Sequence, residues 1–307
     1  MRIVEVEAKE YKELFAKPRH VYNSMEFAQL NSHKATRLHY IVFDDGGARM
    51  GLILGERGDC MYSPFSAPFG GFTTNRAQQF EYFDKAVIAL KEYGENMQKH
   101  IAMTLPPDFY DQHQLPLMIN ALHRHAEIRF VDVNYHFNIN DFADYYSLIE
   151  RNARKNLNRA MKEDLIFNKV GKGDDNGVAR AYDVIRRNRE EHGYPLRMSY
   201  DDVVRTIEII PADFFILSHN NADIAAAQVF HVADDICQVI YWGNLNNYSQ
   251  MRPMNLFAFR IFEYYHKQGL RILDIGPSTE EGVPNYGLCN FKHSIGCKTS
   301  NKFSFLI

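Results

Sequence analysis

One carboxylate of this chain lies in an apolar segment, where a negative charge is unfavourable. Asp274 lies between Leu273 and Ile275 in the segment RILDIGPS, which has the composition of a buried strand. A carboxylate in such surroundings must find hydrogen-bond partners or change its pKa. Two roles are compatible with this position. Asp274 acts either as a general base that accepts a proton from an incoming amine, or as a structural group that caps the backbone of the GPST turn.

A polar loop and the start of a helix precede this strand. The segment CQVIYWGNL is typical of a strand, and NNYSQMR connects it to Pro253, a residue type favoured in the first helical turn. Backbone amides at a helix N-terminus have no partner inside the helix and bind anions. We therefore predict that this region holds the phosphates of a cofactor or an activated donor. The residues assigned to this role are Tyr241, Gly243, Asn247, Ser249, Arg252 and Asn255.

Regularly spaced cations occur in the middle of the chain. The segment 144–165 has helical apolar spacing and contains no helix breaker. Arg151, Lys155, Arg159 and Lys162 fall at steps of four, four and three, so they share one helix face. This stripe is either a solvated surface or a surface that contacts phosphates, for instance of a nucleotide-bearing substrate or a tRNA acceptor stem. Lys155 and Arg159 are its candidate substrate-binding residues.

The elements that must position these residues occur twice along the chain. The first series is predicted as strands at 37–45, 48–58 and 60–69, a helix at 76–99, a strand at 101–105, a helix at 115–125 and a strand at 129–139. The second series is predicted as strands at 214–218, 223–231 and 236–245, a helix at 253–268, a strand at 271–275, a helix at 286–295 and a strand at 301–307. Gly94 and Gly269 are predicted to end the equivalent helix in each series. Order and spacing, more than shared letters, indicate this repeat.

This order predicts an α/β protein of the mixed α+β kind. Each of two tandem domains is expected to contain a mixed, mostly antiparallel sheet flanked by helices. We place the domains at 1–143 and 144–307, and the second includes two linking helices up to residue 192. Gly193 and Pro195 are expected to end the second linking helix, which begins near residue 178.

Composition agrees with two folded domains. The 307 residues are 46% hydrophobic and 13% aromatic, which excludes a disordered chain. The net charge of −3 gives no general reason to expect DNA as a partner. Four cysteines without metal-ligand spacing are typical of free thiols in the cytoplasm, and we expect no metal site. No apolar run reaches the length of a transmembrane helix. The P-loop, GxSxG and HExxH motifs are also absent.

The second half of the chain resembles a known family. The succession YWGNL, Pro253, LDIGPS and FKHSIG is similar to the second domain of the Fem-type aminoacyl and acyl transferases, which consist of two tandem GNAT-like (acyl-CoA N-acyltransferase) domains. YSPFSAPFGGF at 62–72 adds a likeness in the first half, so the resemblance spans nearly the whole chain. The resemblance implies two GNAT-like domains and transfer of an acyl group to an amine. It also implies an acyl-CoA or an aminoacyl-tRNA as co-substrate, with no tightly bound cofactor.

The resemblance assigns roles to individual residues. A Phe-Lys pair near the C-terminus occupies the reaction centre of Fem-type enzymes, and it matches Phe291 and Lys292. Lys292 would stabilise the negative charge on the attacked carbonyl, and Phe291 would shape the donor pocket. The alternative is a surface lysine beside a core phenylalanine. Tyr241 and Tyr286 would donate to the leaving group or line the donor channel, unless they are packing residues of the fold.

The segment RNREEHGYP resembles the part of these proteins that faces the acceptor. It supplies Arg187, His192 and Tyr194 as candidate substrate-binding residues, although His192 could instead be a cationic partner of its helix C-terminus. One feature departs from the pattern. GNAT acetyltransferases have a glycine-rich pyrophosphate loop, because only bare backbone lets the diphosphate approach closely. Residues 247–253 contain no glycine, and no long helical hairpin of the kind that holds tRNA in some members is evident.

Two functions are compatible with these patterns. The first is a cytoplasmic N-acyltransferase or aminoacyltransferase that acts on an amine of a small molecule or of a nucleotide-linked cell-wall precursor, with tRNA as a potential partner. The second is a catalytically silent double-GNAT protein that binds a metabolite or a partner. The ordered motifs favour the first function, and the missing glycine loop favours the second.

Overall fold

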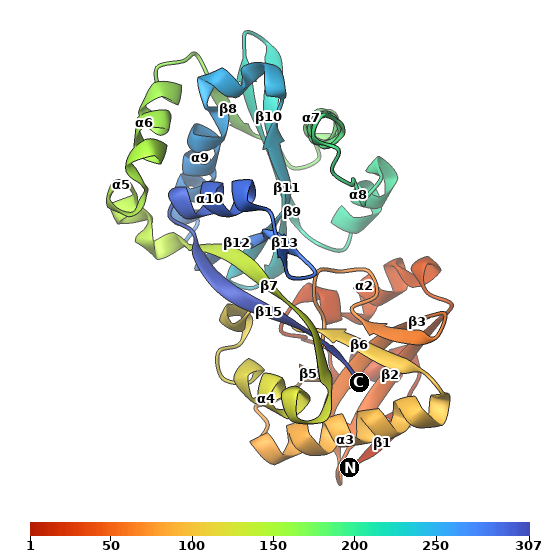
Figure 1. Cartoon of the computed structure of the whole chain (residues 1–307). Helices are drawn as coiled ribbons and strands as arrows, with labels where there is room; N and C mark the ends of the chain where they lie inside the picture. The colour runs from red at the N-terminus through yellow and green to blue at the C-terminus, as the bar shows by residue number, and fades with distance from the viewer. The chain divides into compact units, whose positions relative to one another are not determined.

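The computed structural model describes all residues from Met1 to Ile307. The chain divides into two compact units. The first unit contains Met1–Val133, Thr279–Val283 and Ser300–Ile307, and the second contains Asn134–Ser278 and Pro284–Thr299. Each unit is built on a β-sheet with helices packed on it (Figure 1). None of the helices combines the length and the apolar character needed to cross a bilayer.

The sheet of the first unit has the order β1-β2-β3-β4-β6-β15. Its strands are β1 (Arg2–Glu5), β2 (Arg37–Asp44), β3 (Ala48–Arg57), β4 (Cys60–Ser63), β6 (His100–Thr104) and β15 (Lys298–Leu306), and the short β5 (Thr73–Thr74) pairs with β3. The helices are α1 (Ala8–Leu14), α2 (Met25–Leu30), α3 (Phe80–Met97) and α4 (Leu115–His125). Strands β4 and β6 are parallel, and the other neighbours in this order are antiparallel.

Helices cover both faces of the first sheet. Successive side chains of a strand point to opposite faces, so β2 contributes to two cores. Tyr40 and Val42 pack with Tyr11 of α1 and Ala28 of α2 on one face. Phe43 points to the other face, where its ring contacts Phe72, which in turn contacts Phe83 of α3.

The sheet of the second unit has the order β7-β12-β11-β10-β9-β8. Its strands are β7 (Glu127–Asn138), β12 (Ile272–Pro277), β11 (Ile236–Asn244), β10 (Ala222–Ala233), β9 (Ala212–His219) and β8 (Ile166–Lys169). The helices are α5 (Tyr145–Leu148), α6 (Arg151–Ala160), α7 (Asp175–His192), α8 (Tyr200–Ile207), α9 (Pro253–Lys267) and α10 (Tyr286–Ser294). Strands β11 and β12 are parallel, and the other neighbours are antiparallel.

Helices α7 and α9 cover opposite faces of the second sheet. Phe214 and Ile216 of β9 pack with Val184 of α7 in one core. Phe215 lies between them in sequence and points to the other face, where its ring contacts Tyr265 of α9. This arrangement places the C-terminal end of α7 and the N-terminal end of α9 near the ends of the central strands.

The last strand of each predicted series joins the sheet of the other unit. Strand β7 follows α4 of the first series, but its residues Asn134–Asn138 pair with β12 in the second unit. Strand β15 follows α10 of the second series, and its residues Ser304–Leu306 pair with β6 in the first unit. The two compact units therefore do not coincide with the predicted domains 1–143 and 144–307. The order of elements along the chain does not determine which strands a terminal strand pairs with.

Individual elements depart from the predicted ranges for local reasons. The helix expected at 144–165 is two helices, because Glu150 has an extended backbone and its amide donates to the Ser294 carbonyl at 3.0 Å. Gly94 lies inside α3, where a Cβ would come within 2.9 Å of the Lys99 carbonyl oxygen, so close approach and not helix termination explains this glycine. Gly269 does follow the end of α9, and Gly193 ends α7 in the left-handed conformation.

Further short elements were not part of the predicted series. They include β1, α1, α2 and β5 in the first unit and β8 and α8 in the second. The strand expected at 60–69 ends at Ser63, and the rest of that segment is a loop. All four cysteines are free thiols.

Candidate functional site

The parallel strands β11 and β12 separate in the middle of the second sheet. They are paired at three positions, the last of which is Gln238 with Asp274. Beyond this pair, β11 continues to Asn244 and β12 to Pro277 without further pairing between them. A cavity of about 580 Å³ lies at this opening. Its lining includes Val239 and Ile240 of β11 and Ile275 and Pro277 of β12.

Asp274 fixes the point at which the two strands separate. Its carboxylate is fully buried and accepts hydrogen bonds from the side-chain amides of Asn134 in β7 at 2.8 Å and Gln238 in β11 at 2.7 Å. It also accepts a bond from the Gly276 amide at 2.8 Å. Gly276 adopts a φ of +75° beside a bulge in β12, a conformation that favours glycine. Asp274 does not line the cavity, so this placement favours the structural role over that of a general base.

Lys292 of α10 brings a buried amine to the cavity. The residue is only 4% exposed, and its Nζ donates to the carbonyl oxygens of Gly276 and Pro277, each at 2.9 Å. An ammonium group has three donors, so one N–H remains for a ligand. Burial lowers the pKa of Lys292 to about 8, because leaving water disfavours the charged form. The neighbouring Asp274 acts in the opposite direction and helps to retain the charge.

Apolar side chains lie next to this amine. Phe291 lines the cavity, and its ring meets the ring of Trp242 edge to face, with 6.1 Å between the centroids. Leu288 of α10 and Met254 of α9 also line the cavity. Such a wall suits the apolar part of a donor or acceptor, and the polar groups around it would fix the orientation of the ligand.

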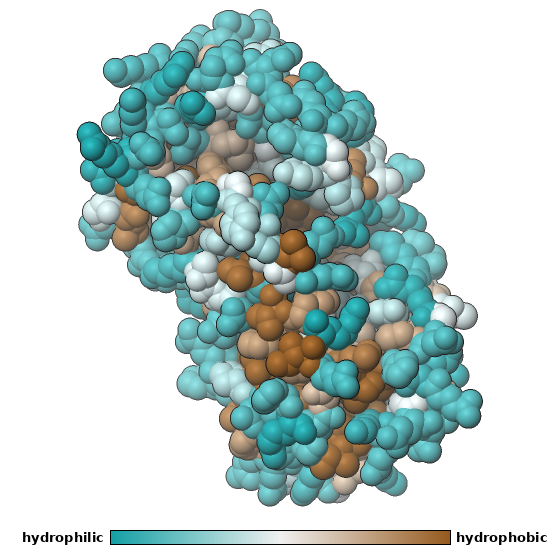
Figure 2. Space-filling model, in the orientation of Figure 1, coloured by the Kyte–Doolittle hydropathy of each residue, from teal (hydrophilic) through white to brown (hydrophobic).

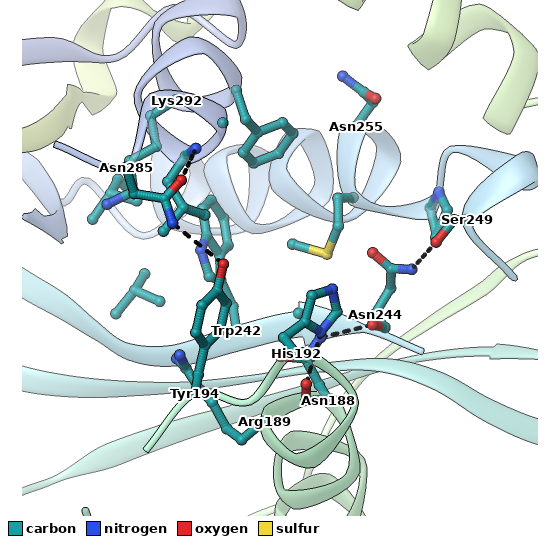
Figure 3. A pocket seen from close by; sticks show the side chains of 18 of the residues that line it. Asn188, Arg189, His192, Tyr194, Trp242, Asn244, Ser249, Asn255, Asn285 and Lys292 are labelled. Carbon is teal, nitrogen blue, oxygen red and sulfur yellow. Dashed lines mark hydrogen bonds between the residues drawn. The ribbon is translucent and has the colours of Figure 1, made fainter. Parts of the chain in front are cut away.

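The loop between β11 and α9 forms a polar wall. Asn244 donates through Nδ2 to the hydroxyl of Ser249 at 3.1 Å, and both residues line the cavity (Figure 3). Arg252 has a φ of +57°, the left-handed conformation that glycine would adopt without strain. Pro253 and Asn255, in the first turn of α9, complete this wall.

The C-terminal end of α7 forms the facing wall. Nδ1 of His192 donates a hydrogen bond to the Asn188 carbonyl oxygen at 2.8 Å, and the imidazole ring stacks on that of Tyr194. The hydroxyl of Tyr194 accepts a hydrogen bond from Nδ2 of Asn285, the residue before α10, at 3.3 Å (Figure 3). Asn188 occupies the space beside Gly243, where a Cβ would lie 2.5 Å from the side-chain amide.

The cavity has a one-sided set of charges. Arg189, Arg252 and Lys292 line it together with His192, and no aspartate or glutamate is among the lining residues. Amide side chains from Asn156, Asn188, Asn244, Asn255 and Asn285 supply most of its neutral polar groups. The arrangement therefore suits an anionic or strongly polar ligand.

Several predicted site residues converge here. Lys292, Phe291, Gly243, Ser249, Arg252, Asn255, His192 and Tyr194 all line the cavity. The sequence-based assignment missed Asn188, Arg189, Trp242, Asn244 and Asn285. Helical spacing could have found two of them, because Asn188 and Arg189 precede His192 by four and three residues and so share its helix face.

The remaining candidates lie elsewhere. Tyr241 is buried in the core under α7, and its hydroxyl accepts a hydrogen bond from the Arg197 amide at 3.1 Å. Tyr286 is 74% exposed, and neither it nor the exposed Asn247 lines the cavity. Arg187 lies on another face of α7, beside a second cavity of about 450 Å³.

Lys155 and Arg159 lie on the outer face of α6. Both are exposed, as are Arg151 and Lys162 of the same stripe. Figure 2 shows a hydrophilic surface over this helix, at the upper left of the view. Asn156, the residue after Lys155, is the α6 residue that reaches the cavity.

Comparisons with known proteins show the fold. No protein-family model matches the sequence, and no curated protein matches it. Among solved structures, FemX is 10% identical and aligns over 100% of this chain and 98% of its own, with a TM-score of 0.69. The C-terminal domain of a candidate lysylphosphatidylglycerol synthetase from Agrobacterium fabrum is 10% identical over 97% of this chain and 91% of its own, with a TM-score of 0.62.

A third solved structure is that of a protein with two tandem GNAT domains. A tandem GNAT protein from the clavulanic acid biosynthesis pathway is 12% identical over 100% of this chain and 98% of its own, with a TM-score of 0.54. In each unit, one parallel strand pair among antiparallel neighbours, with helices on both faces, agrees with this similarity. The predicted fold class is confirmed, and the chain has the Fem-like tandem GNAT fold.

Proposed function

We propose that this protein is an acyltransferase that uses the cavity between β11 and β12 to move an acyl or aminoacyl group onto an amine. One observation carries the proposal. The buried ammonium of Lys292 is fixed by two carbonyls of β12 and retains an N–H at a cavity that has no acidic lining residue. A positioned donor in a site shielded from water stabilises a developing oxyanion far better than it would in solvent.

The chemistry that this geometry supports is aminolysis. The nitrogen of the acceptor amine attacks the carbonyl carbon of the donor, and the carbonyl oxygen gains negative charge that the free N–H of Lys292 stabilises. The C–N bond forms in this same step, and the tetrahedral intermediate then collapses as the bond from the carbonyl carbon to the thioester sulfur or ester oxygen breaks. The proton of the attacking amine passes to the leaving group or to water.

The donor is proposed to be an acyl-CoA or an aminoacyl-tRNA. The acceptor is an amine on a small molecule or on a nucleotide-linked cell-wall precursor, encountered in the cytoplasm. The shared fold with FemX and with a tandem GNAT protein supports this choice of chemistry. The positive cavity supports donors and acceptors that carry phosphates. The exposed cations of α6 would contact the phosphates of a tRNA donor.

The test measures transfer by the wild type and two lysine variants. Release of free thiol from acyl-CoAs, or of uncharged tRNA from aminoacyl-tRNAs, is followed with a panel of primary amines. Lys292→Ala should lower the rate by about 100-fold or more, as expected for loss of an oxyanion donor. Lys298→Ala is the matched control, because Lys298 is exposed and pairs with Asp141. Equal rates for wild type and Lys292→Ala would refute the proposed mechanism.

A second function, binding without catalysis, is favoured by one observation. The loop before α9 contains no glycine, and Arg252 adopts the conformation that a glycine would provide. Calorimetry with the same donors separates the two functions. Saturable binding of a donor without transfer to any amine would favour the silent binding protein.

A further inference from the structure

Arg189 differs from the other arginines of helix α7. Arg180 forms a two-pronged ion pair with Asp223, with both bonds at 2.8 Å. Arg186 pairs with Asp183 and Glu190, and Arg187 lies 3.9 Å from Asp183. Arg189 has no carboxylate within ion-pair distance, although two glutamates follow it in sequence. Those two glutamates are engaged by Arg186 and by the Asn246 amide.

The Arg189 guanidinium is held in place by aromatic rings. Its central carbon lies 5.0 Å from the ring centroid of Tyr241 and 5.7 Å from that of Tyr194. Its Nε is buried and has no hydrogen-bond partner. Burial lowers the pKa of Arg189, since desolvation disfavours the cation. Figure 3 shows Arg189 beside Tyr194, on the α7 wall of the cavity.

A half-buried cation without a counter-ion is unfavourable in the empty protein. Proteins normally compensate a buried charge with a partner of opposite sign. No lining residue of the cavity is acidic, so the chain itself supplies no such partner at this wall. We propose that Arg189 binds an oxyanion group, a phosphate or a carboxylate, of the ligand that enters the cavity.

The opposite wall of the cavity fits a ligand of this class. Arg252 and the first turn of α9 present a second cation and a helix N-terminus to the same space. Arginine suits the recognition because its planar fork matches the geometry of phosphate and carboxylate oxygens. The inference deepens the proposed function by naming the ligand class, and it rests on that function for the choice of this cavity as the reaction site.

The chain contains a built-in probe for the experiment. Its single tryptophan, Trp242, lines the same cavity. Trp242 fluorescence is followed while inorganic pyrophosphate or succinate is added to the full-length protein at constant ionic strength. The variants are Arg189→Gln, Arg189→Lys and the control Arg186→Gln. Saturable binding is expected in the wild type, and the tighter of the two probes identifies the oxyanion as phosphate or carboxylate.

Arg189→Gln should weaken binding by about 10- to 100-fold, as expected for loss of a charge-assisted hydrogen bond. Arg189→Lys should fall between wild type and Arg189→Gln, because it keeps the charge and loses the fork. Arg186→Gln should bind within about twofold of the wild type, since its side chain has acidic partners outside the cavity. No carboxylate loses an ion-pair partner in Arg189→Gln. The midpoint of thermal unfolding of this variant should therefore equal or exceed that of the wild type.

Three results would overturn the inference. They are no saturable response to either anion, equal affinities of wild type and Arg189→Gln, and equal losses in the Arg189→Gln and Arg186→Gln variants. Wild-type protein provides a second measurement that needs no variant. Phenylglyoxal modification of Arg189, located by mass spectrometry, should slow with the tighter probe, and an unchanged rate would also contradict the inference. Neither measurement requires turnover. The anion-binding inference can therefore fail while acyl transfer is observed, and acyl transfer can be absent while anion binding is observed.

Discussion

The two parallel strand pairs of the molecule end in opposite ways. In the second unit, β11 and β12 separate beyond Asp274 and leave the cavity between them. In the first unit, β4 and β6 are paired up to Ser63 and Met103, and the loop that follows β4 closes the gap. The Gly70 amide of this loop donates to the Thr104 carbonyl at 2.9 Å, and the Gly71 amide donates to the Ser63 hydroxyl at 3.0 Å.

The closing loop is also packed with aromatic rings. Phe69 is 1% exposed and contacts His20, Tyr22 and Tyr110, with centroid distances between 4.7 and 5.2 Å. The buried lysine of the first unit, Lys302, has a carboxylate 3.4 Å away in Asp132, whereas Lys292 has only carbonyl acceptors. The repeated topology is thus used for packing in one unit and for an accessible charged cavity in the other.

The largest effect should be seen in the pH dependence of transfer. If Lys292 acts as a cation, it is competent below its pKa of about 8 and loses its charge as the pH rises through that value. The rate should therefore fall about tenfold per pH unit above pH 8, and about 100-fold by pH 10. Initial rates at saturating donor provide the measurement. The same dependence on pH in wild type and Lys292→Ala would contradict the assignment of this fall to Lys292.

The next largest effect concerns the point of strand separation. Asp274→Ala leaves three buried donors without their acceptor, on Asn134, Gln238 and Gly276. We expect the free energy of unfolding to fall by about 3 kcal/mol, measured by urea denaturation. A loss below about 1 kcal/mol would mean that Asp274 does not hold the three strands together.

In the first unit, the loop that closes the end of the β4–β6 pair should be sensitive to substitution of Gly71. This residue has a φ of +95°, and an added Cβ would lie 2.6 Å from a methyl carbon of Leu105. Gly71→Ala should therefore lower the free energy of unfolding by about 2 kcal/mol. Gly58→Ala is a useful control, because Gly58 also has a positive φ but no atom within 4 Å of the added Cβ. Equal losses in both variants would show that backbone strain alone, without the contact to Leu105, matters.

The smallest effect is expected at Ser63. Ser63→Ala removes the acceptor for the Gly71 amide and should cost about 1 kcal/mol. Because this bond belongs to the closed pair, the transfer rate should remain within about twofold of the wild type. Denaturation and initial-rate assays check the two parts. A large loss of activity with an intact fold would indicate that the first unit contributes to catalysis.

Much of the fold could be predicted, because hydrophobic periodicity and the residues that favour helix starts and turns indicate the elements directly. The order of strand, helix and strand around Pro253 follows from alternation, helical spacing and one favoured residue at a helix start. The exchange of the terminal strands could not be predicted. The residues of β15 are typical of a strand, but they do not indicate which strand it pairs with.

The site was predictable to a lesser degree. The Phe-Lys motif predicts Phe291 and Lys292, and the helix start at Pro253 predicts the loop before it as a second part of the site. Phe291, Lys292, Ser249 and Arg252 all line the cavity, whereas Asn247 does not. Tyr241 takes the packing role that the sequence left open, and a bulge in β11 lies between Val239 and Tyr241. Helical spacing places Arg189 on the face of His192, but the lack of a carboxylate partner for its guanidinium is a property of the folded structure that a sequence does not show.

The exchange of β7 and β15 constrains how the protein can be made. Thr104 at the end of β6 and Ser304 of β15 hydrogen bond to each other across 200 positions of the chain. A ribosome that adds roughly 5 to 20 residues per second needs about 10 to 40 s to synthesise that interval. During this time the nascent first unit exposes an unpaired sheet edge, a site where another chain could add a strand. The edge of β6 is covered only after β15 has been synthesised and has paired with it.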